Sequence, residues 1–284
     1  MKRLLLVVGF VTACASASAP PPRAPDPPAA PQFQPTSFAV HVAGTGRPVI
    51  LIPGLGCPSS IWDDTVAHLG AGYQTHVLQV AGFAGAPAKP GDAPLSRTVR
   101  EELAKYISDR HLQHPVIIGH SMGGFIAMWL AAESPDVVGP VVVVDGMPHL
   151  PGIDEATAGK MRDHILAMND AEFAQSNRDF FMNMFSDPKR ADVVIAEVIK
   201  SDKHAFAEAF HELLVTDIRS ELVKITAPVL VLVADGPVAD EIQKQVTAIP
   251  HHDSKLLPHT HHFVMYDDPK GTFAAIDAFL AAHP

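Results

Sequence analysis

The sequence predicts an α/β fold, in which a mostly parallel central sheet carries helices on both faces, for one domain over residues 36–284. Short β-branched runs alternate with segments of helical periodicity from residue 36 onward, which is the pattern of such a sheet. The runs at 49–52 and 141–144 are apolar throughout, as expected of strands buried on both faces. Residues 146–226 break this alternation, and they predict a helical lid inserted between two strands.

The remaining elements follow from the same patterns. The expected strands cover residues 37–42, 49–52, 76–80, 116–118, 141–144, 229–233 and 254–257. A helix is expected from Ser60, and a second over residues 96–111, where apolar residues recur at helical spacing and Glu101 stands four residues before Lys105. A third, apolar helix is expected from about residue 125 to 132.

Methionine and phenylalanine mark successive helical faces within the expected lid. These apolar residues are Met161, Ile165, Met168, Phe173, Phe180, Phe181, Met184 and Phe185. Packing between helices would explain them, and so would a deformable apolar wall over a pocket.

Composition excludes several classes of protein. The chain has 284 residues, of which 47% are apolar, and this fits one large α/β domain rather than a mostly disordered chain. Its 2 cysteines cannot form the dense disulfide framework of a small secreted scaffold. The net charge of −10, without any cluster of Lys and Arg, excludes nucleic acid as a partner.

The first 19 residues have the order of an export signal. Lys2 and Arg3 precede an apolar run at 4–11, which is too short to span a bilayer, and small residues follow it. Residues 11–14 resemble the lipobox of bacterial lipoproteins, which implies lipidation at Cys14. Ordinary cleavage after the small residues and an uncleaved segment remain alternatives. We therefore expect an exported protein, either anchored in the periplasm or cell envelope as a lipoprotein or secreted.

A proline-rich segment separates this signal from the domain. Eight of the residues between 20 and 35 are proline, a composition that favours extended polyproline II and opposes sheet formation. The segment is interpreted as a semi-rigid spacer, which together with a lipidated Cys14 would form a membrane tether. A disordered tail without that role is the alternative.

A G-x-S-x-G pattern occupies residues 119–123, directly after an expected strand and before an expected helix. In this context the serine sits on a sharp strand-to-helix turn, so Ser121 is predicted to be a nucleophile. Gly119 and Gly123 are expected where a Cβ would clash with the turn. The positive end of the following helix would favour an oxyanion formed beside Ser121.

On these residues the chain resembles the α/β-hydrolase family over essentially all of residues 36–284. The resemblance implies a serine hydrolase that forms an acyl-enzyme and needs no cofactor. Residues 53–56, Pro-Gly-Leu-Gly, stand where the family usually has His-Gly-x-Gly. This implies that the backbone N–H groups of Leu55 and Met122 form the oxyanion hole. Cys57, in the same loop, is expected to be a buried thiol and not a nucleophile.

The stretch 261–269 resembles the histidine loop of that family, in which an aromatic residue follows the histidine and an acidic-Pro pair starts the final helix. The resemblance implies that His262 is the general base. Other histidines crowd this region, namely His251, His252, His259 and His261. Their spacing matches no helical two-His motif and no carboxylate completes a ligand set, so no metal site is predicted.

Two residues are candidates for the acid that orients His262. The commonest family position lies in a Gly-x-x-Asp turn after the strand at 229–233, but Pro237 occupies that position and leaves Asp235 as the nearest acid. Asp145, after the strand at 141–144, corresponds to the arrangement of some haloalkane dehalogenases. Both follow the chain order Ser, acid, His. Asp145 is our first choice, although a strand-end role for Asp145 and a turn role for Asp235 are also possible.

The predicted activity is hydrolysis of a small carboxylic ester or a related acyl bond. Ser121 argues against haloalkane dehalogenases and epoxide hydrolases, which have an aspartate at that place. A lactone hydrolase of the acyl-homoserine-lactone type would share all of these residues and differ only in its pocket. A non-catalytic binding module on the same fold is the alternative from another class.

Overall fold

The structure, a computed structural model, describes residues 32–91 and 93–284. The expected export signal, its Cys14 and residues 20–31 of the proline-rich segment lie outside the described residues. Residues 32–35, the end of that segment, form neither helix nor strand. Among the described residues, the helices are too short or too polar to cross a membrane.

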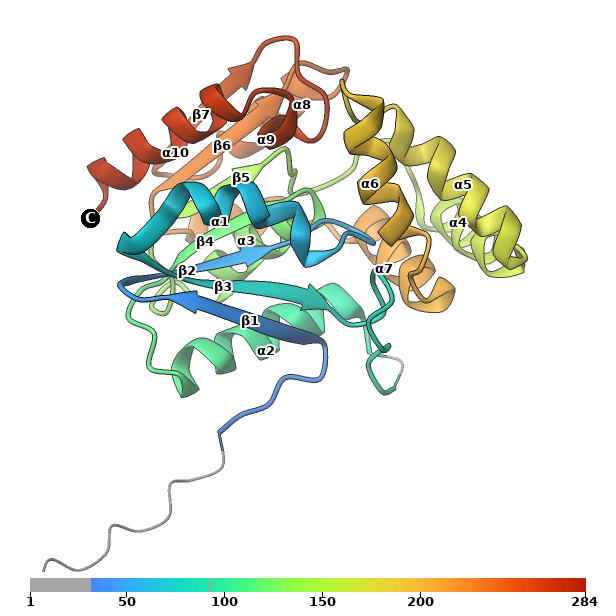
Figure 1. The fold of residues 1–284 in the computed structure, drawn as a ribbon, viewed down its shortest axis with the longest axis horizontal. Helices are drawn as coiled ribbons and strands as arrows, with labels where there is room; N and C mark the ends of the chain where they lie inside the picture. Colours follow the sequence, from blue (N-terminus) through green and yellow to red (C-terminus); the bar gives the residue numbers. More distant parts are fainter. Residues whose placement is uncertain (1–31, 92) are drawn as a thin grey trace, which may run out of the picture. The chain divides into compact units, whose positions relative to one another are not determined.

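A seven-stranded sheet in the order β1-β3-β2-β4-β5-β6-β7 forms the centre of the domain (Figure 1). Its strands are β1 Phe38–Gly44, β2 Arg47–Ile52, β3 Tyr73–Val80, β4 Val116–His120, β5 Val141–Val144, β6 Val229–Ala234 and β7 His252–Leu257. All neighbouring strands run parallel except β1 and β3, which are antiparallel. The prediction of a mostly parallel sheet is confirmed.

The strand β3 begins at Tyr73, three residues before its predicted start. The extension pairs with β1, since Gln74 lies opposite Gly44 and Thr75 opposite Ala43. Its first residues are polar, so they carry little of the apolar signal by which a strand is recognised in sequence. Pairing with a neighbouring strand, rather than local composition, therefore sets this boundary.

Helices cover both faces of the sheet (Figure 1). Those of the core are α1 Asp63–Leu69, α2 Leu95–Asp109, α3 Met122–Glu133, α8 Ala239–Val246, α9 Val264–Asp267 and α10 Pro269–Ala282. In the view of Figure 1, α1 crosses the middle of the sheet, α10 runs beside β6 and β7, and α2 lies next to β1. All residues of α3 from Met122 to Ala132 are buried, which explains why this helix is apolar on every side.

Four helices are inserted between β5 and β6, which confirms the predicted helical insertion. They are α4 Glu155–Ala167, α5 Asp170–Met182, α6 Pro188–Val198 and α7 Lys203–Val215. Each begins after an Asp or Asn whose side chain accepts a hydrogen bond from the first turn; the caps are Asp154, Asn169, Asp187 and Asp202. Such caps stabilise a helix by about 1 kcal/mol each, so the sequence fixes where these helices start.

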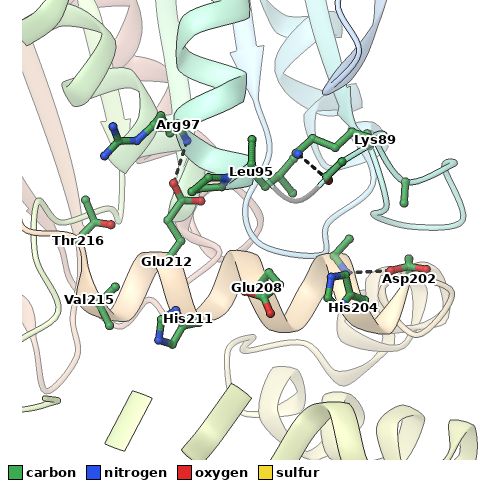
Figure 2. A pocket seen from close by; sticks show the side chains of 16 residues that line it. Lys89, Leu95, Arg97, Asp202, His204, Glu208, His211, Glu212, Val215 and Thr216 are labelled. Carbon is green, nitrogen blue, oxygen red and sulfur yellow. Dashed lines mark hydrogen bonds between the residues drawn. The ribbon is translucent and has the colours of Figure 1, made fainter. Parts of the chain in front are cut away.

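A buried carboxylate ties the insertion to the core. Glu212 of α7 accepts hydrogen bonds from the backbone N–H groups of Ser96 at 2.7 Å and of Arg97 at 3.0 Å, at the start of α2 (Figure 2). Burial raises the pKa of this carboxyl, while the two N–H donors oppose the shift. Glu212 and Asp202 both line a pocket of about 510 Å³ beside α7, where Asp202 caps α7 and Glu212 binds the first turn of α2.

His76 gives the fold a dependence on pH. It is buried on β3, where its Nε2 lies 3.1 Å from Gln74 Oε1 and its Nδ1 lies 2.8 Å from the hydroxyl of Tyr106. Burial, helped by the positive charge of Arg110, lowers the pKa of His76 to about 4. An exposed histidine in the unfolded chain has a pKa of about 6.5. The unfolded chain therefore takes up this proton first, and stability falls as pH decreases from about 6.5 toward 4.

We expect the variant His76→Gln to lose less unfolding free energy than the natural protein between pH 7 and pH 4.5, because it removes this titration. Urea denaturation at a series of pH values would measure the difference between the two proteins. Parallel stability curves over that interval would contradict the assignment.

Candidate active site

Ser121 stands on a strained turn between β4 and α3. Its backbone has φ +55° and ψ −118°, a conformation that residues other than glycine seldom adopt. The turn is held on both sides, since Ser121 N–H donates to the carbonyl of Val144 at 2.9 Å and the Ser121 carbonyl accepts from Phe125 N–H at 3.0 Å. The sharp strand-to-helix turn expected around this serine is therefore present.

Glycines permit this turn because backbone atoms crowd it. A Cβ on Gly119 would lie 2.2 Å from the carbonyl oxygen of Gly123, and a Cβ on Gly123 would lie 2.1 Å from that of Ile52. Backbone atoms cannot rotate away as a side chain can, so both positions require glycine. Gly146 has a similar role, since a Cβ there would lie 2.8 Å from the carbonyl oxygen of Ser121. This third glycine lies outside the G-x-S-x-G pattern, which therefore gives no sign of it.

Asp145 lies directly after β5 and contacts His262. It is 7% exposed and, like Ser121, has a positive φ, here +47°. One carboxylate oxygen lies 2.6 Å from His262 Nδ1, and the other accepts a hydrogen bond from Ala234 N–H at 2.8 Å. Because a carboxylate only accepts, Nδ1 of His262 carries the proton and Nε2 is the other ring nitrogen.

Asp235 has a different position. Its carboxylate is exposed and accepts a hydrogen bond from the backbone N–H of His259 at 3.0 Å. It thus supports the loop that leads to His262 but does not contact the His262 side chain. Of the two predicted acids, the structure brings only Asp145 to the histidine ring.

His120, the residue before Ser121, binds the backbone of His262. Its Nε2 donates to the backbone carbonyl of His262 at 3.0 Å, and its ring lies 4.4 Å from that of Phe263 between centroids. Burial lowers the pKa of His120 well below its usual value, with a further contribution from His262. The neutral ring therefore holds the histidine loop at neutral pH. In the sequence, His120 is a variable position of the G-x-S-x-G pattern, so the pattern does not indicate this role.

Leu55 and Met122 are buried next to Ser121, with Leu55 following β2 and Met122 beginning α3. Within the described part of the chain, neither backbone N–H donates a hydrogen bond to another protein group. The nearby Gly54 carbonyl accepts from Cys57 N–H at 3.1 Å, which shapes the loop. Cys57 is 1% exposed, and burial raises the pKa of its thiol, so the thiol stays protonated. This agrees with the predicted buried thiol.

A pocket of about 360 Å³ opens at Ser121 and His262 beneath the insertion. Four of the methionine and phenylalanine residues noted in the sequence line it: Met161, Phe180, Phe181 and Met184. Three other apolar residues of that series, Ile165, Met168 and Phe173, line a neighbouring pocket inside the insertion. The ring of Phe185 stacks on that of Phe263 at 4.0 Å between centroids. Most of the apolar side chains noted in the insertion thus line one of these two pockets.

Comparison with known proteins identifies the family. A profile described as the alpha/beta hydrolase family matches residues 49–276. The chain belongs to this family. It is a hydrolase, and the geometry above occupies the place where members of the family carry their chemistry.

Individual relatives of this hydrolase are distant. N-formylmaleamate deformylase of Pseudomonas putida is 27% identical over 251 residues, which cover 86% of this chain and 92% of the relative. A pimeloyl-[acyl-carrier protein] methyl ester esterase of Vibrio atlanticus is 24% identical over 257 residues, covering 85% of this chain and 94% of the relative.

Among solved structures, a thermophilic esterase of Thermogutta terrifontis superposes with a TM-score of 0.77 at 20% identity, over 90% of this chain and 100% of that one. The enol-lactonase of Burkholderia xenovorans superposes with a TM-score of 0.76 at 16% identity, over 86% and 96%. At these identities the two structures show that the fold is shared.

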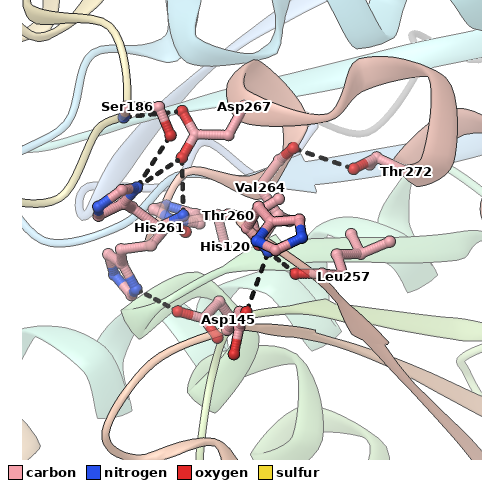
Figure 3. Close-up of polar contacts among 12 residues, drawn as sticks. His120, Asp145, Ser186, Leu257, Thr260, His261, Val264, Asp267 and Thr272 are labelled. Carbon is pink, nitrogen blue, oxygen red and sulfur yellow. Dashed lines mark hydrogen bonds and ion pairs between the residues drawn. The ribbon is translucent and has the colours of Figure 1, made fainter.

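The histidine loop of the hydrolase is also bound to the insertion. Asp267 accepts hydrogen bonds from the backbone N–H groups of Ser186 at 3.0 Å and of His261 at 2.7 Å. The Ser186 hydroxyl lies 2.9 Å from His261 Nδ1, and Figure 3 shows these three side chains turned toward one another. Phe263 N–H donates to the carbonyl of Met184 at 3.3 Å. These contacts hold residues 184–186 against the loop that carries His262.

The other histidines near this loop do not gather into a metal site. His252 Nδ1 contacts the carbonyl of Ile249 at 2.8 Å, while His261 pairs with Ser186 and Asp267. Among the described residues, no group of three His, Cys, Asp or Glu side chains is arranged to hold a metal ion.

We expect Asp267→Ala to lower the free energy of unfolding by about 1–3 kcal/mol, because it removes a buried carboxylate that accepts hydrogen bonds from two backbone N–H groups. The Asp267 side chain is 2% exposed. Asp277→Ala is the matched control: Asp277 pairs with His68 but its side chain is 58% exposed, so its loss should change stability by less than about 1 kcal/mol. Urea denaturation of both variants would measure this, and equal effects would contradict the role of Asp267.

Proposed function

We propose that this hydrolase cleaves a small, uncharged carboxylic ester with Ser121 as nucleophile, His262 as general base and Asp145 as the acid that orients it. The observation that carries the proposal is the hydrogen bond of 2.6 Å between Asp145 and His262. His262 lines the same pocket as Ser121. Asp145 fixes the tautomer with the proton on Nδ1, so Nε2 remains available as a base.

The proposed reaction has two stages. Ser121 Oγ attacks the acyl carbonyl as His262 Nε2 takes its proton, and the N–H groups of Leu55 and Met122 stabilise the resulting oxyanion. The intermediate collapses to an acyl-enzyme, and His262 gives the proton to the departing alcohol. Water, activated by the same histidine, then releases the acid and restores Ser121. Pro53 in place of the usual histidine leaves the Leu55 donor available.

The pocket favours an uncharged acyl group. Apart from His120, Ser121 and His262, its described lining consists of apolar side chains and Gly54, with no Lys or Arg. A carboxylate or phosphate in this space would lose its hydration without gaining a positive partner. Among the relatives, the esterase of Vibrio atlanticus is named for a methyl ester and the relative of Pseudomonas putida for a deformylation, so ester or amide substrates are both consistent with the family.

Export and tethering through Cys14 remain part of the proposal, supported by the sequence pattern alone. If Cys14 is lipidated, cell fractionation should find the full-length enzyme in membranes and Cys14→Ala in the soluble fraction. Recovery of both proteins in the soluble fraction outside the cytoplasm would favour ordinary secretion instead.

We expect a fluorophosphonate probe to label the purified enzyme at Ser121 and to leave Ser121→Ala unlabelled, because only an activated serine attacks this reagent. Mass spectrometry of the labelled peptide identifies the residue. Absence of labelling in the natural protein would refute the serine hydrolase mechanism and favour a non-catalytic binding module. Parallel assays with a lactone and its open-chain ester analogue would show whether a lactone is the better substrate.

We expect Asp145→Asn to reduce kcat by about 10³–10⁴-fold, because asparagine would favour the wrong tautomer of His262. The matched variant Asp235→Asn should reduce kcat by less than about tenfold, since Asp235 contacts only a backbone N–H. Steady-state hydrolysis of a chromogenic acetate or butyrate ester measures both. If only Asp235→Asn lost several orders of magnitude, the assignment of Asp145 would be wrong.

A further inference from the structure

We propose that the acyl chain of the substrate extends from Ser121 into a second pocket inside the insertion, past Phe180 and Phe210. The enzyme would then select esters of medium-length alkyl acids over acetate esters. This inference rests on the proposed function, because it takes Ser121 as the point at which the acyl group is attached.

Two pockets meet inside the insertion. The pocket of about 360 Å³ contains Ser121 and His262, and the second, of about 230 Å³, lies between α4, α5 and α7. They have three lining residues in common, Met161, Phe180 and Phe210. The side chains of these residues therefore form the wall between the two pockets, and a chain that passes this wall would enter a space continuous with the reaction site.

The second pocket suits an alkyl chain. Its described lining is mostly aliphatic and aromatic, and it contains no Lys, Arg, Asp or Glu; the residues beyond the shared wall are His164, Ile165, Met168, Phe173, Ser176, Asn177 and Phe206. The only polar ones are a histidine, a serine and an asparagine. Asn177, 4% exposed, uses its side-chain N–H to donate to the Phe173 carbonyl of its own helix. A charged group on the chain would find no partner of opposite sign here.

The dividing wall contains an exposed aromatic side chain. Phe180 is 46% exposed although it is a large apolar residue, and its ring meets that of Phe210 edge-on at 6.0 Å between centroids. An alkyl chain lying against the Phe180 ring would cover apolar surface that is otherwise in water, and burying such surface stabilises a complex by about 25 cal/mol per Å².

The two sides of the wall belong to different helices. Phe210 stands on α7, which Glu212 fixes to the core through two backbone N–H groups of α2. Phe180 stands on α5, and its neighbour Phe181 also lines the pocket of Ser121. A rotation of the Phe180 or Met161 side chain would open the wall without moving α7.

Binding without turnover tests the chain site directly. In a Ser121→Ala background, isothermal titration with methyl butanoate, hexanoate, octanoate and decanoate should show affinity rising by about fourfold per added methylene. Ser176→Trp, placed only in the second pocket, should stop this rise at a shorter chain. Val193→Trp, on α6 at a residue that is 68% exposed, is the matched control and should behave as the parent.

Turnover gives a second measurement. We expect Phe210→Ala to raise the ratio of kcat/KM for decanoate over butanoate p-nitrophenyl esters by at least tenfold, because it removes part of the wall, and Ser176→Trp to lower the same ratio. Phe210→Leu, a smaller change, should shift the ratio in the same direction and serves if the alanine variant fails to fold.

The outcomes separate this inference from the proposed function. Affinity that stops rising at the same chain length in the parent, Ser176→Trp and Val193→Trp would overturn the chain site, as would the absence of any ester binding. Chain-length-dependent binding that Ser176→Trp shortens would support it even if no probe labelled Ser121, and in that case only the hydrolytic mechanism would fail.

Discussion

The close approach of α3 to the ends of β2 and β4 is the constraint on which the rest of the site depends. Gly119 and Gly123 allow backbone to meet backbone there, and the chain accepts a strained conformation at Ser121 as a result. The same packing places the start of α3 beside the loop of Leu55. One steric requirement therefore sets both the position of the hydroxyl and the position of the two N–H groups proposed to stabilise the oxyanion.

The insertion is attached to this core by buried acceptors. Glu212 binds the start of α2, and Asp267 binds Ser186 and His261, so one carboxylate lies on the insertion and the other lies on the core. Each carboxylate accepts hydrogen bonds from two backbone N–H groups, and hydrogen bonds to a charged group are worth more than those between neutral groups. Helix α7 and the loop of His262 are consequently fixed relative to each other and to the core.

The choice between Asp145 and Asp235 shows what a sequence leaves open. Both residues follow a parallel strand and both precede His262 in the chain, so chain order does not separate them, and the preference for Asp145 rests on Pro237 standing at the usual acid position. The carboxyl ends of β5 and β6 lie side by side in the sheet, and Asp145 reaches across to Ala234 N–H with one oxygen and to His262 with the other. Asp235, one residue beyond β6, instead turns to the backbone of His259.

The sequence by itself determined the central part of each strand, the place of the helical insertion and the glycine-lined turn at Ser121, because each is encoded by residues close together in the chain. Local pattern did not show which residues meet across the fold. The contacts that it left open are those of Asp145 with His262, of His120 with the His262 backbone, of Asp267 with Ser186, and of Phe180 with Phe210. These contacts join residues from separate elements, and only the packing of the sheet against the insertion decides which side chains meet.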